Sequence, residues 1–136
     1  ARHDPRLFYA STHQSHFYPG TGDRNDSAVP NLVNAPLARG SGSVEFRHAF
    51  ERIVLPALAE FAPELVTISA GFDAHRRDPL AGLNLVDEDF AWATERLVKQ
   101  ATASASGRLV SILEGGYDLE ALAGATAAHV RALMAA

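Results

Sequence analysis

The sequence predicts an α/β fold in which helices flank a parallel sheet. Short hydrophobic, partly β-branched runs alternate along the chain with longer segments of helical periodicity, an order typical of βαβ units. The two clearest strands, at residues 65–70 and 109–113, each stop at glycine and then present a polar side chain, Asp73 or Tyr117. Because ligands of open parallel sheets bind at the carboxyl ends of the strands, we expect these two side chains to face a common pocket.

Length and composition narrow the class of protein. A chain of 136 residues suits one domain, and its net charge of -4 comes from interspersed acids and bases, which predicts no direct nucleic-acid binding. The sequence contains no cysteine, which excludes disulfides and thiolate metal sites. No apolar run reaches the roughly eighteen residues that a membrane span needs. We therefore expect a cytoplasmic protein that contacts no membrane.

The first half of the chain predicts one strand, one long loop and one helix. The strand is expected at residues 6–12, and an irregular stretch rich in Gly, Pro, Asn and Asp follows as far as about residue 42. Loops of that length are usually functional. From Ser43, a suitable N-cap, apolar residues recur on one helical face as far as Phe61. Pro56 lies within this helix and predicts a kink or a break.

The second half alternates strands and helices more regularly. After the strand at residues 65–70, a helix is expected to begin near Asp87, where three consecutive acids favour the positive end of the helix dipole. Gly107 is its expected C-terminal glycine. The strand at residues 109–113 then leads to a final helix, for which Asp118 is the predicted cap.

Three strands make a thin sheet for a parallel α/β fold, because such sheets normally have more strands and helices on both faces. The chain is therefore expected to be part of a larger α/β domain. A complementing N-terminal half or a second copy of the chain would cover the exposed edge of the sheet.

Asp73 and Tyr117 each have two interpretations when taken alone. Asp73 is either a helix cap or the ion-pair partner of a neighbouring arginine, or it is an oxygen ligand to a metal such as zinc. Tyr117 follows a Gly-Gly pair, which allows close approach of the backbone to a ligand. It either packs at the end of a loop or donates a hydrogen bond to an oxyanion. Their equivalent positions at two strand ends favour the functional interpretation of both.

The remaining polar features are weaker indicators. The six histidines show no spacing typical of a helical metal motif, and His129, on the last predicted helix, is expected to be structural. His13 follows the first strand and is expected to support the site or the core. The sequence YPGTGD at residues 18–23 lacks the lysine of a phosphate-binding loop, so nucleotide binding is poorly supported.

Five motifs, in order and with consistent spacing, resemble the zinc-dependent histone deacetylase family. The similarity is closest to its bacterial and class II-like branch, which includes the acetylpolyamine amidohydrolases, and it covers nearly the whole chain. The motifs are STHQ at 11–14, YPGTGD at 18–23, NAPL at 34–37, SAGFDAH with DPL at 69–80, and LEGGYDL at 113–119.

The resemblance implies an arginase-like, three-layer α/β domain, of which residues 1–136 form the carboxyl-terminal part. It also implies a zinc-dependent amide hydrolase that removes acetyl groups from lysine or from polyamine-type amines. In the family two aspartates and one histidine hold the zinc, and Asp73 matches the last of these aspartates. Tyr117 matches the tyrosine that stabilises the tetrahedral oxyanion, while a histidine base deprotonates the zinc-bound water.

The resemblance assigns further residues to the substrate channel and to a second metal. Tyr18 and Leu80 match an aromatic wall and an apolar wall of the acyl-lysine tunnel, and Gly115 and Gly116 match residues that line it. Ser11 and Thr12 match positions that bind a structural monovalent cation, K⁺ or Na⁺, the serine through its hydroxyl and the threonine through its carbonyl.

The chain departs from the family pattern in what it lacks. No His-His pair occurs in these residues, and the resemblance implies that this pair and the Asp-x-His zinc motif of the family both lie upstream of the first strand. The loop at residues 24–31 also has less glycine than the family pattern leads us to expect. Two hypotheses follow: the chain is the carboxyl-terminal half of a zinc deacetylase, inactive by itself, or it is a non-catalytic binding or assembly module.

Overall fold

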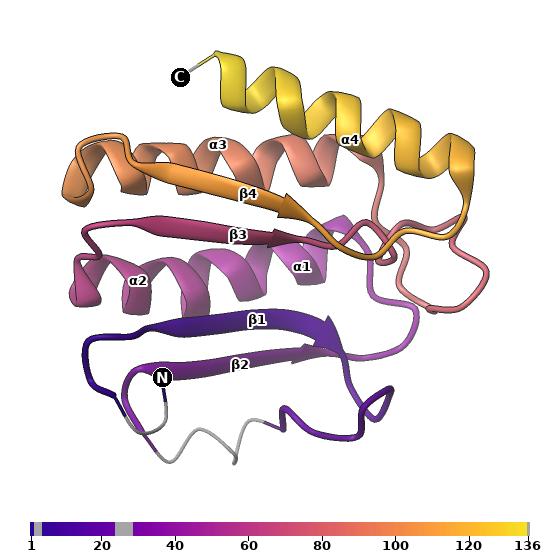
Figure 1. The fold of residues 1–136 in the computed structure, drawn as a ribbon. Coiled ribbons are helices and arrows are strands. Elements are labelled where there is room, and N and C mark those ends of the chain that lie inside the picture. Colours follow the sequence, from indigo (N-terminus) through magenta and orange to yellow (C-terminus); the bar gives the residue numbers. More distant parts are fainter. Residues whose placement is uncertain (2–3, 24–28, 136) are drawn as a thin grey trace.

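The computed structural model describes residues 1, 4–23 and 29–135, and it is an α/β fold. Figure 1 shows helices and parallel strands alternating along the chain. The elements are β1 Tyr9–Gln14, β2 Leu32–Leu37, α1 Ser43–Ala49, a π-helical segment Phe50–Val54, α2 Leu55–Phe61, β3 Val66–Ala70, α3 Asp87–Ser104, β4 Leu109–Leu113 and α4 Leu119–Met134.

The strands form two parallel pairs rather than one three-stranded sheet. β1 pairs with β2 and β3 pairs with β4, in the registers Tyr9↔Leu32 and Val66↔Leu109. Three of the four correspond to the strands predicted at residues 6–12, 65–70 and 109–113. In Figure 1 the four arrows point the same way, so all the carboxyl ends lie at one end of the molecule.

The strand β2 lies within the stretch that the sequence predicts to be a long loop, so that prediction was wrong there. The strand was missed because it contains Pro36. Proline has no backbone N–H to donate to a neighbouring strand, so it argues against a strand in the sequence. The backbone bonds from Tyr9 N to Asn31 O and from Ser15 N to Leu37 O place the odd-numbered residues of β2 toward β1. Pro36 therefore faces the free edge, where a strand tolerates proline. Most of the glycine-poor segment 24–31 lies outside the described residues.

The helix expected from Ser43 to Phe61 is present, and Pro56 does not break it. A π-helical segment, Phe50–Val54, directly precedes the turn that contains the proline. The wider π turn accommodates the ring, and Pro56 occupies the first turn of α2, where a missing N–H costs little. The N-cap is Gly42 rather than Ser43: the Gly42 N–H donates to Glu45 at 2.9 Å.

The other predicted helix ends are confirmed. α3 begins at Asp87 and ends before Gly107, whose φ of +77° is the left-handed conformation of a terminal glycine and whose N–H donates to Ala101 O at 3.0 Å. The carboxylate of Asp118 caps α4 by accepting the Ala121 N–H at 2.8 Å. These ends fix where each helix starts relative to the strand before it.

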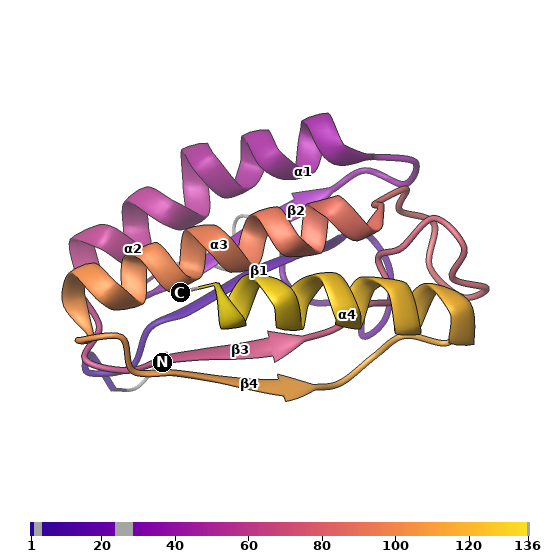
Figure 2. The ribbon, with the colours of Figure 1, turned by 90° about the horizontal axis from the view of Figure 1, so that it is seen from above.

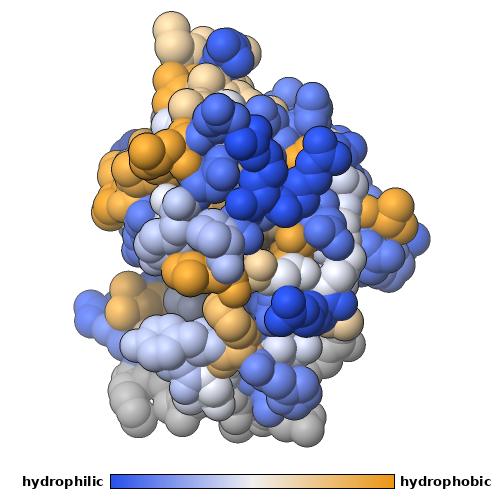
Figure 3. Space-filling model, turned by 90° about the vertical axis from the view of Figure 1, so that its right-hand side faces the viewer, coloured by the Kyte–Doolittle hydropathy of each residue, from blue (hydrophilic) through white to orange (hydrophobic). Residues whose placement is uncertain are grey.

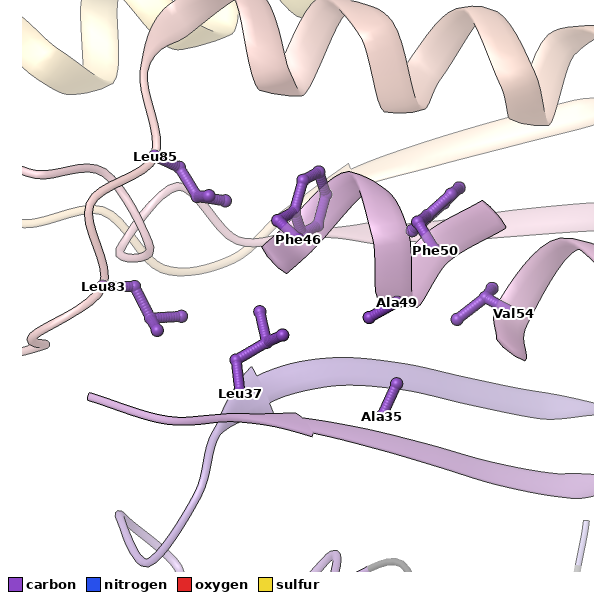
Figure 4. Close-up of a cluster of buried hydrophobic side chains, with 8 residues drawn as sticks. All are labelled: Ala35, Leu37, Phe46, Ala49, Phe50, Val54, Leu83 and Leu85. Carbon is purple, nitrogen blue, oxygen red and sulfur yellow. The ribbon is translucent and has the colours of Figure 1, made fainter. Parts of the chain in front are cut away.

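The largest core cluster joins β2 to the long helix. Figure 4 shows side chains from β2, from α1 with its continuation and from the loop before α3 converging on one volume. Its members are Ala35, Leu37, Phe46, Ala49, Phe50, Val54, Leu83 and Leu85. Figure 2 shows the helices on one side of β3 and β4. On the other side of β4, Val110 and Ile112 are about half exposed. No helix among the described residues is both long and apolar enough to cross a membrane.

Two buried polar networks lock the helices together. Asp89, on α3, is fully buried and accepts hydrogen bonds from Ser43 at 2.7 Å and from Arg47 at 2.8 Å, which ties α1 to α3. His129, on α4, lies between two hydroxyls, Thr94 Oγ1 at 2.6 Å from Nδ1 and Ser111 Oγ at 2.8 Å from Nε2. The expected structural role of His129 is thus borne out: it links α3, β4 and α4.

Burial lowers the pKa of His129 from its ordinary value of 6.5. Below this value the unfolded chain binds a proton at His129 more readily than the folded chain does. The free energy of unfolding is therefore unaffected by His129 above about pH 6.5, and it decreases as the pH falls toward the folded pKa. We predict that His129→Gln flattens the pH dependence of the free energy of unfolding in this window, measured by urea titration. His48→Gln, which removes an exposed histidine, is the control and keeps the slope. An unchanged slope in His129→Gln would contradict the assignment.

Candidate functional site

A cavity of about 560 Å³ lies between the two strand pairs. Figure 3 faces this end of the molecule, where the strand arrows of Figure 1 point, and polar and apolar surfaces lie side by side there. The walls come from the end of β1, from β3 and the loop after it, and from the inner faces of α1 and α3. Asp73 and Tyr117 both line this cavity, as expected from their positions after the two strands.

Asp73 occupies a cradle that only glycine permits. A Cβ on Gly115 would lie 2.9 Å from the Asp73 carboxylate carbon, and a Cβ on Gly71 would lie 3.1 Å from Oδ1. The backbone bond from Phe72 N to Gly115 O, at 2.8 Å, holds the two loops at this separation. The glycines after β3 and β4 thus serve to admit a carboxylate between the loops.

The electrostatics around Asp73 favour a cation. Desolvation by burial raises the pKa of the Asp73 carboxyl, and the nearby charges of Asp78 and Glu114 raise it further. One alternative was an ion pair between Asp73 and a neighbouring arginine. Arg77 does not form that pair, because it pairs with Glu120 and Asp118. A half-buried carboxylate with acidic neighbours fits an oxygen ligand of a divalent metal.

Tyr117 is presented outward by the loop after β4. Its side chain is 57% exposed, so packing does not hold it, and the interpretation as a merely packed aromatic is not supported. Its N–H donates to Asp78 Oδ2 at 3.0 Å. The same carboxylate accepts the N–H groups of Leu80 and Ala81 through Oδ1, at 2.9 and 3.1 Å. In the sequence, Asp78 is marked only by its place in the DPL motif.

The residues predicted to line the channel divide into two groups. Tyr18 and Leu80 line the cavity and are largely exposed, at 90% and 59%. Gly115 and Gly116 are not among its lining residues. Gly115 packs under Asp73 instead, and Gly116, with φ of +136°, lies against Leu122 and Phe72.

The residues at the end of β1 form a hydrogen-bonded group. Ser11 Oγ lies 2.9 Å from His13 Nδ1, and His13 Nε2 lies 2.9 Å from Gly22 O. Both ring nitrogens of His13 are therefore engaged, which fits the supporting role expected for it. Thr12 and His13 line the cavity. The Ser11 hydroxyl, expected at a cation, contacts the imidazole in this structure.

A second histidine lies close behind the site. His75 is buried, its Nδ1 accepts the Arg77 N–H at 3.2 Å, and its Nε2 lies 3.4 Å from Asp87 Oδ1. In the sequence, only its place in the SAGFDAH motif distinguishes His75 from the other histidines. Within the part of the chain that the structure describes, no three His, Cys, Asp or Glu side chains gather closely enough to hold a metal. Asp73 thus stands as a single candidate ligand.

Comparison with protein families and solved structures agrees with this geometry. The model of the histone deacetylase domain matches residues 1–133. Among solved structures, that of the histone deacetylase Clr3 is 32% identical, with a TM-score of 0.88 over 97% of this chain and 23% of that chain. The HDA15 HD domain is also 32% identical, with a TM-score of 0.86 over 94% of this chain and 38% of that one. The chain shares the arginase-like α/β fold of these deacetylase domains.

Several curated relatives are deacetylases by name. "Histone deacetylase 10, chloroplastic" of Oryza sativa subsp. japonica is 41% identical over 96% of this chain and 30% of its own length. The "Probable deacetylase" of Archaeoglobus fulgidus is 38% identical over 86% of this chain and 34% of its own. The chain therefore spans about a third of the length of these two relatives. The matching domain model, the shared fold and the order of the motifs all agree. The chain belongs to the histone deacetylase family.

Proposed function

We propose that this chain supplies the downstream half of a zinc-dependent site that hydrolyses acetyl amides of lysine or of small polyamine-type amines. The observation that carries the proposal is the shared cavity: Asp73 and Tyr117, from the ends of β3 and β4, both line it. One offers a carboxylate in an electrostatic setting that favours a cation, and the other offers an unpacked phenol. Family membership supports deacetylation as the reaction class.

Each of the two residues has a separate task in this proposal. Asp73 would hold zinc through its carboxylate, in the space that Gly71 and Gly115 leave for it. When bound, zinc polarises the acyl carbonyl and lowers the pKa of its water. The Tyr117 hydroxyl donates a hydrogen bond to the carbonyl oxygen as negative charge develops there, and this bond is stronger to the charged oxygen than to the neutral carbonyl.

The apolar walls of the cavity suit the methylene chain of an acylated amine. Tyr18 and Leu80 stand at its exposed side, and Gly115 and Gly116 would act by letting the loop approach rather than by contact. We also propose that Ser11 and Thr12 contribute to a K⁺ or Na⁺ site, which requires the Ser11 hydroxyl to turn away from His13.

We propose that the missing ligands and the base come from a complementing N-terminal half that inserts a strand between β1 and β3. In the described residues β1 pairs only with β2 and β3 only with β4. The ladder bond from Val66 N to Arg108 O directs the even-numbered residues of β3 toward β4, so Thr67 and Ser69 turn their backbone groups the other way. The cavity occupies the space between these inner edges.

The second candidate is a non-catalytic binding or assembly module. The exposed apolar side chains of Val110 and Ile112, together with the free inner edges of β1 and β3, favour association of two copies of the chain. It predicts a stable homodimer of the 136-residue chain without any hydrolase activity.

Tyr117→Phe, in the domain completed to the length of its relatives, is expected to lower kcat by about 10²–10³-fold, because one oxyanion donor is lost. Steady-state kinetics with an acetyl-lysine reporter measures this. Tyr9→Phe, at the opposite end of β1, is the matched control and leaves kcat unchanged. Equal turnover in wild type and Tyr117→Phe would remove Tyr117 from the mechanism.

Asp73→Asn should weaken zinc binding in the completed domain, because a neutral amide is a poorer ligand than a carboxylate. Zinc content after dialysis against a competing chelator is the readout. Glu114→Gln removes a neighbouring negative charge without lining the cavity, so it separates ligation from general electrostatics. Retention of zinc by Asp73→Asn, or an equal loss in Glu114→Gln, would contradict ligation by Asp73.

The isolated chain is expected to give negligible hydrolysis of the acetyl-lysine reporter, since Asp73 alone cannot hold zinc tightly. Addition of a separately prepared N-terminal half should produce activity that a chelator abolishes and that the Tyr117→Phe chain fails to produce. Analytical ultracentrifugation of the chain alone tests the second candidate. A homodimer that gains no activity from the other half would favour the assembly module.

A further inference from the structure

We infer that Asp78 is a positioning residue that holds the oxyanion donor Tyr117 and the channel wall at Leu80 in register. The inference rests on the proposed function of Tyr117 but concerns a residue that touches neither metal nor substrate in that proposal. Asp78 is 9% exposed and lies in the loop between β3 and α3, five residues beyond Asp73.

The Asp78 carboxylate bridges two loops that are distant in sequence. Oδ1 accepts the N–H groups of Leu80 and Ala81, and Oδ2 accepts the N–H of Tyr117, 39 residues away. The Asp78 N–H in turn donates to His75 O at 2.9 Å. A buried carboxylate with three backbone donors is well satisfied, and its bonds to N–H groups are stronger than neutral ones. The bridge is therefore a firm restraint on both loops.

Tyr117 depends on this restraint because its side chain is largely exposed and it follows a glycine. The residue before it, Gly116, has φ of +136°, a conformation that confers no rigidity by itself. The side chain is mostly exposed, so packing contributes little. On its other side Asp118 begins α4 as the N-cap. The Asp118 carboxylate accepts from Ala121 and not from Tyr117, so the bond to Asp78 is the restraint on the Tyr117 N–H, and it is shared with the channel wall.

Leu80 is positioned by the same group. Its side chain is 59% exposed where it lines the cavity, so its location depends on the turn that Asp78 Oδ1 closes. One carboxylate consequently sets both the wall that guides the substrate and the donor that acts on its carbonyl. A change at one oxygen of Asp78 should affect catalysis, and a change at the other should affect binding.

Asp78→Asn separates these two effects. Its single carbonyl oxygen keeps two bonds if it faces Leu80 and Ala81, and its NH₂ group then faces the Tyr117 N–H, donor against donor. In the completed domain we expect kcat to fall on the order of tenfold with KM nearly unchanged, since one charge-assisted bond is lost. Asp78→Ala loses all three bonds, so it should lower kcat and also raise KM.

The matched control is Asp118→Asn, which removes the same charge one residue from Tyr117. Asparagine caps a helix about as well as aspartate, so kcat and KM should stay at the wild-type values. In the Tyr117→Phe background, Asp78→Asn should cause no further fall in kcat, because the hydroxyl it positions is gone. An equal fall in both backgrounds, or an unchanged kcat in Asp78→Asn, would overturn the inference.

Amide hydrogen exchange tests the tether without any catalysis. In the metal-free protein, Asp78→Asn should accelerate exchange of the Tyr117 amide on the order of tenfold while the Leu80 and Ala81 amides keep their rates. If the Tyr117 amide is equally protected in the wild type and in Asp78→Asn, the inference fails, whatever the values of kcat are. If exchange changes as expected but Tyr117→Phe is fully active, the tether stands and the proposed role of Tyr117 fails.

Discussion

The parallel pairing of β3 with β4 is the constraint on which the candidate site depends. The register Ala70↔Leu113 brings the two strand ends level, and two further bonds, Glu114 N to Ala70 O and Phe72 N to Gly115 O, extend the contact into the loops. These bonds set the Asp73 carboxylate against Gly115, two residues before Tyr117. A shift of the register would separate the carboxylate from the phenol and reverse the faces of the strand.

Three buried or half-buried carboxylates differ in how their negative charge is stabilised by hydrogen bonds and ion pairs. Asp89 is fully buried but paired with Arg47 and hydrogen-bonded by Ser43, so it strengthens the contact of α1 with α3. Asp78 is satisfied by three backbone donors and bridges two loops. For Asp73, desolvation and two acidic neighbours raise its pKa instead. A carboxylate whose pKa is raised by burial and like charges at the edge of a cavity is typical of a functional site.

Local signals were enough to predict three of the four strands and most helix ends. The cap at Asp118, the terminal glycine at Gly107 and the acidic start at Asp87 are each decided by contacts within a few residues, so sequence patterns report them well. The strand β2 was not predicted because Pro36 indicates a loop when the sequence is considered alone. Its position becomes compatible with a strand only when the partner β1 is known to lie on the opposite side. At Pro56, where a kink or a break was predicted, the helix continues, and the π-helical segment Phe50–Val54 is the irregularity that precedes the proline.

By itself the sequence determined the alternation of strands and helices, the two strand-end residues Asp73 and Tyr117, and their motifs. Those features depend on short-range periodicity and on residue chemistry. Only the tertiary structure decided that the strands form two separate pairs with a cavity between them, and that Asp78 joins the loops of Leu80 and Tyr117. The reason is physical: a hydrogen bond between residues 39 positions apart leaves no periodic trace in a sequence, because its geometry exists only once both strands have paired.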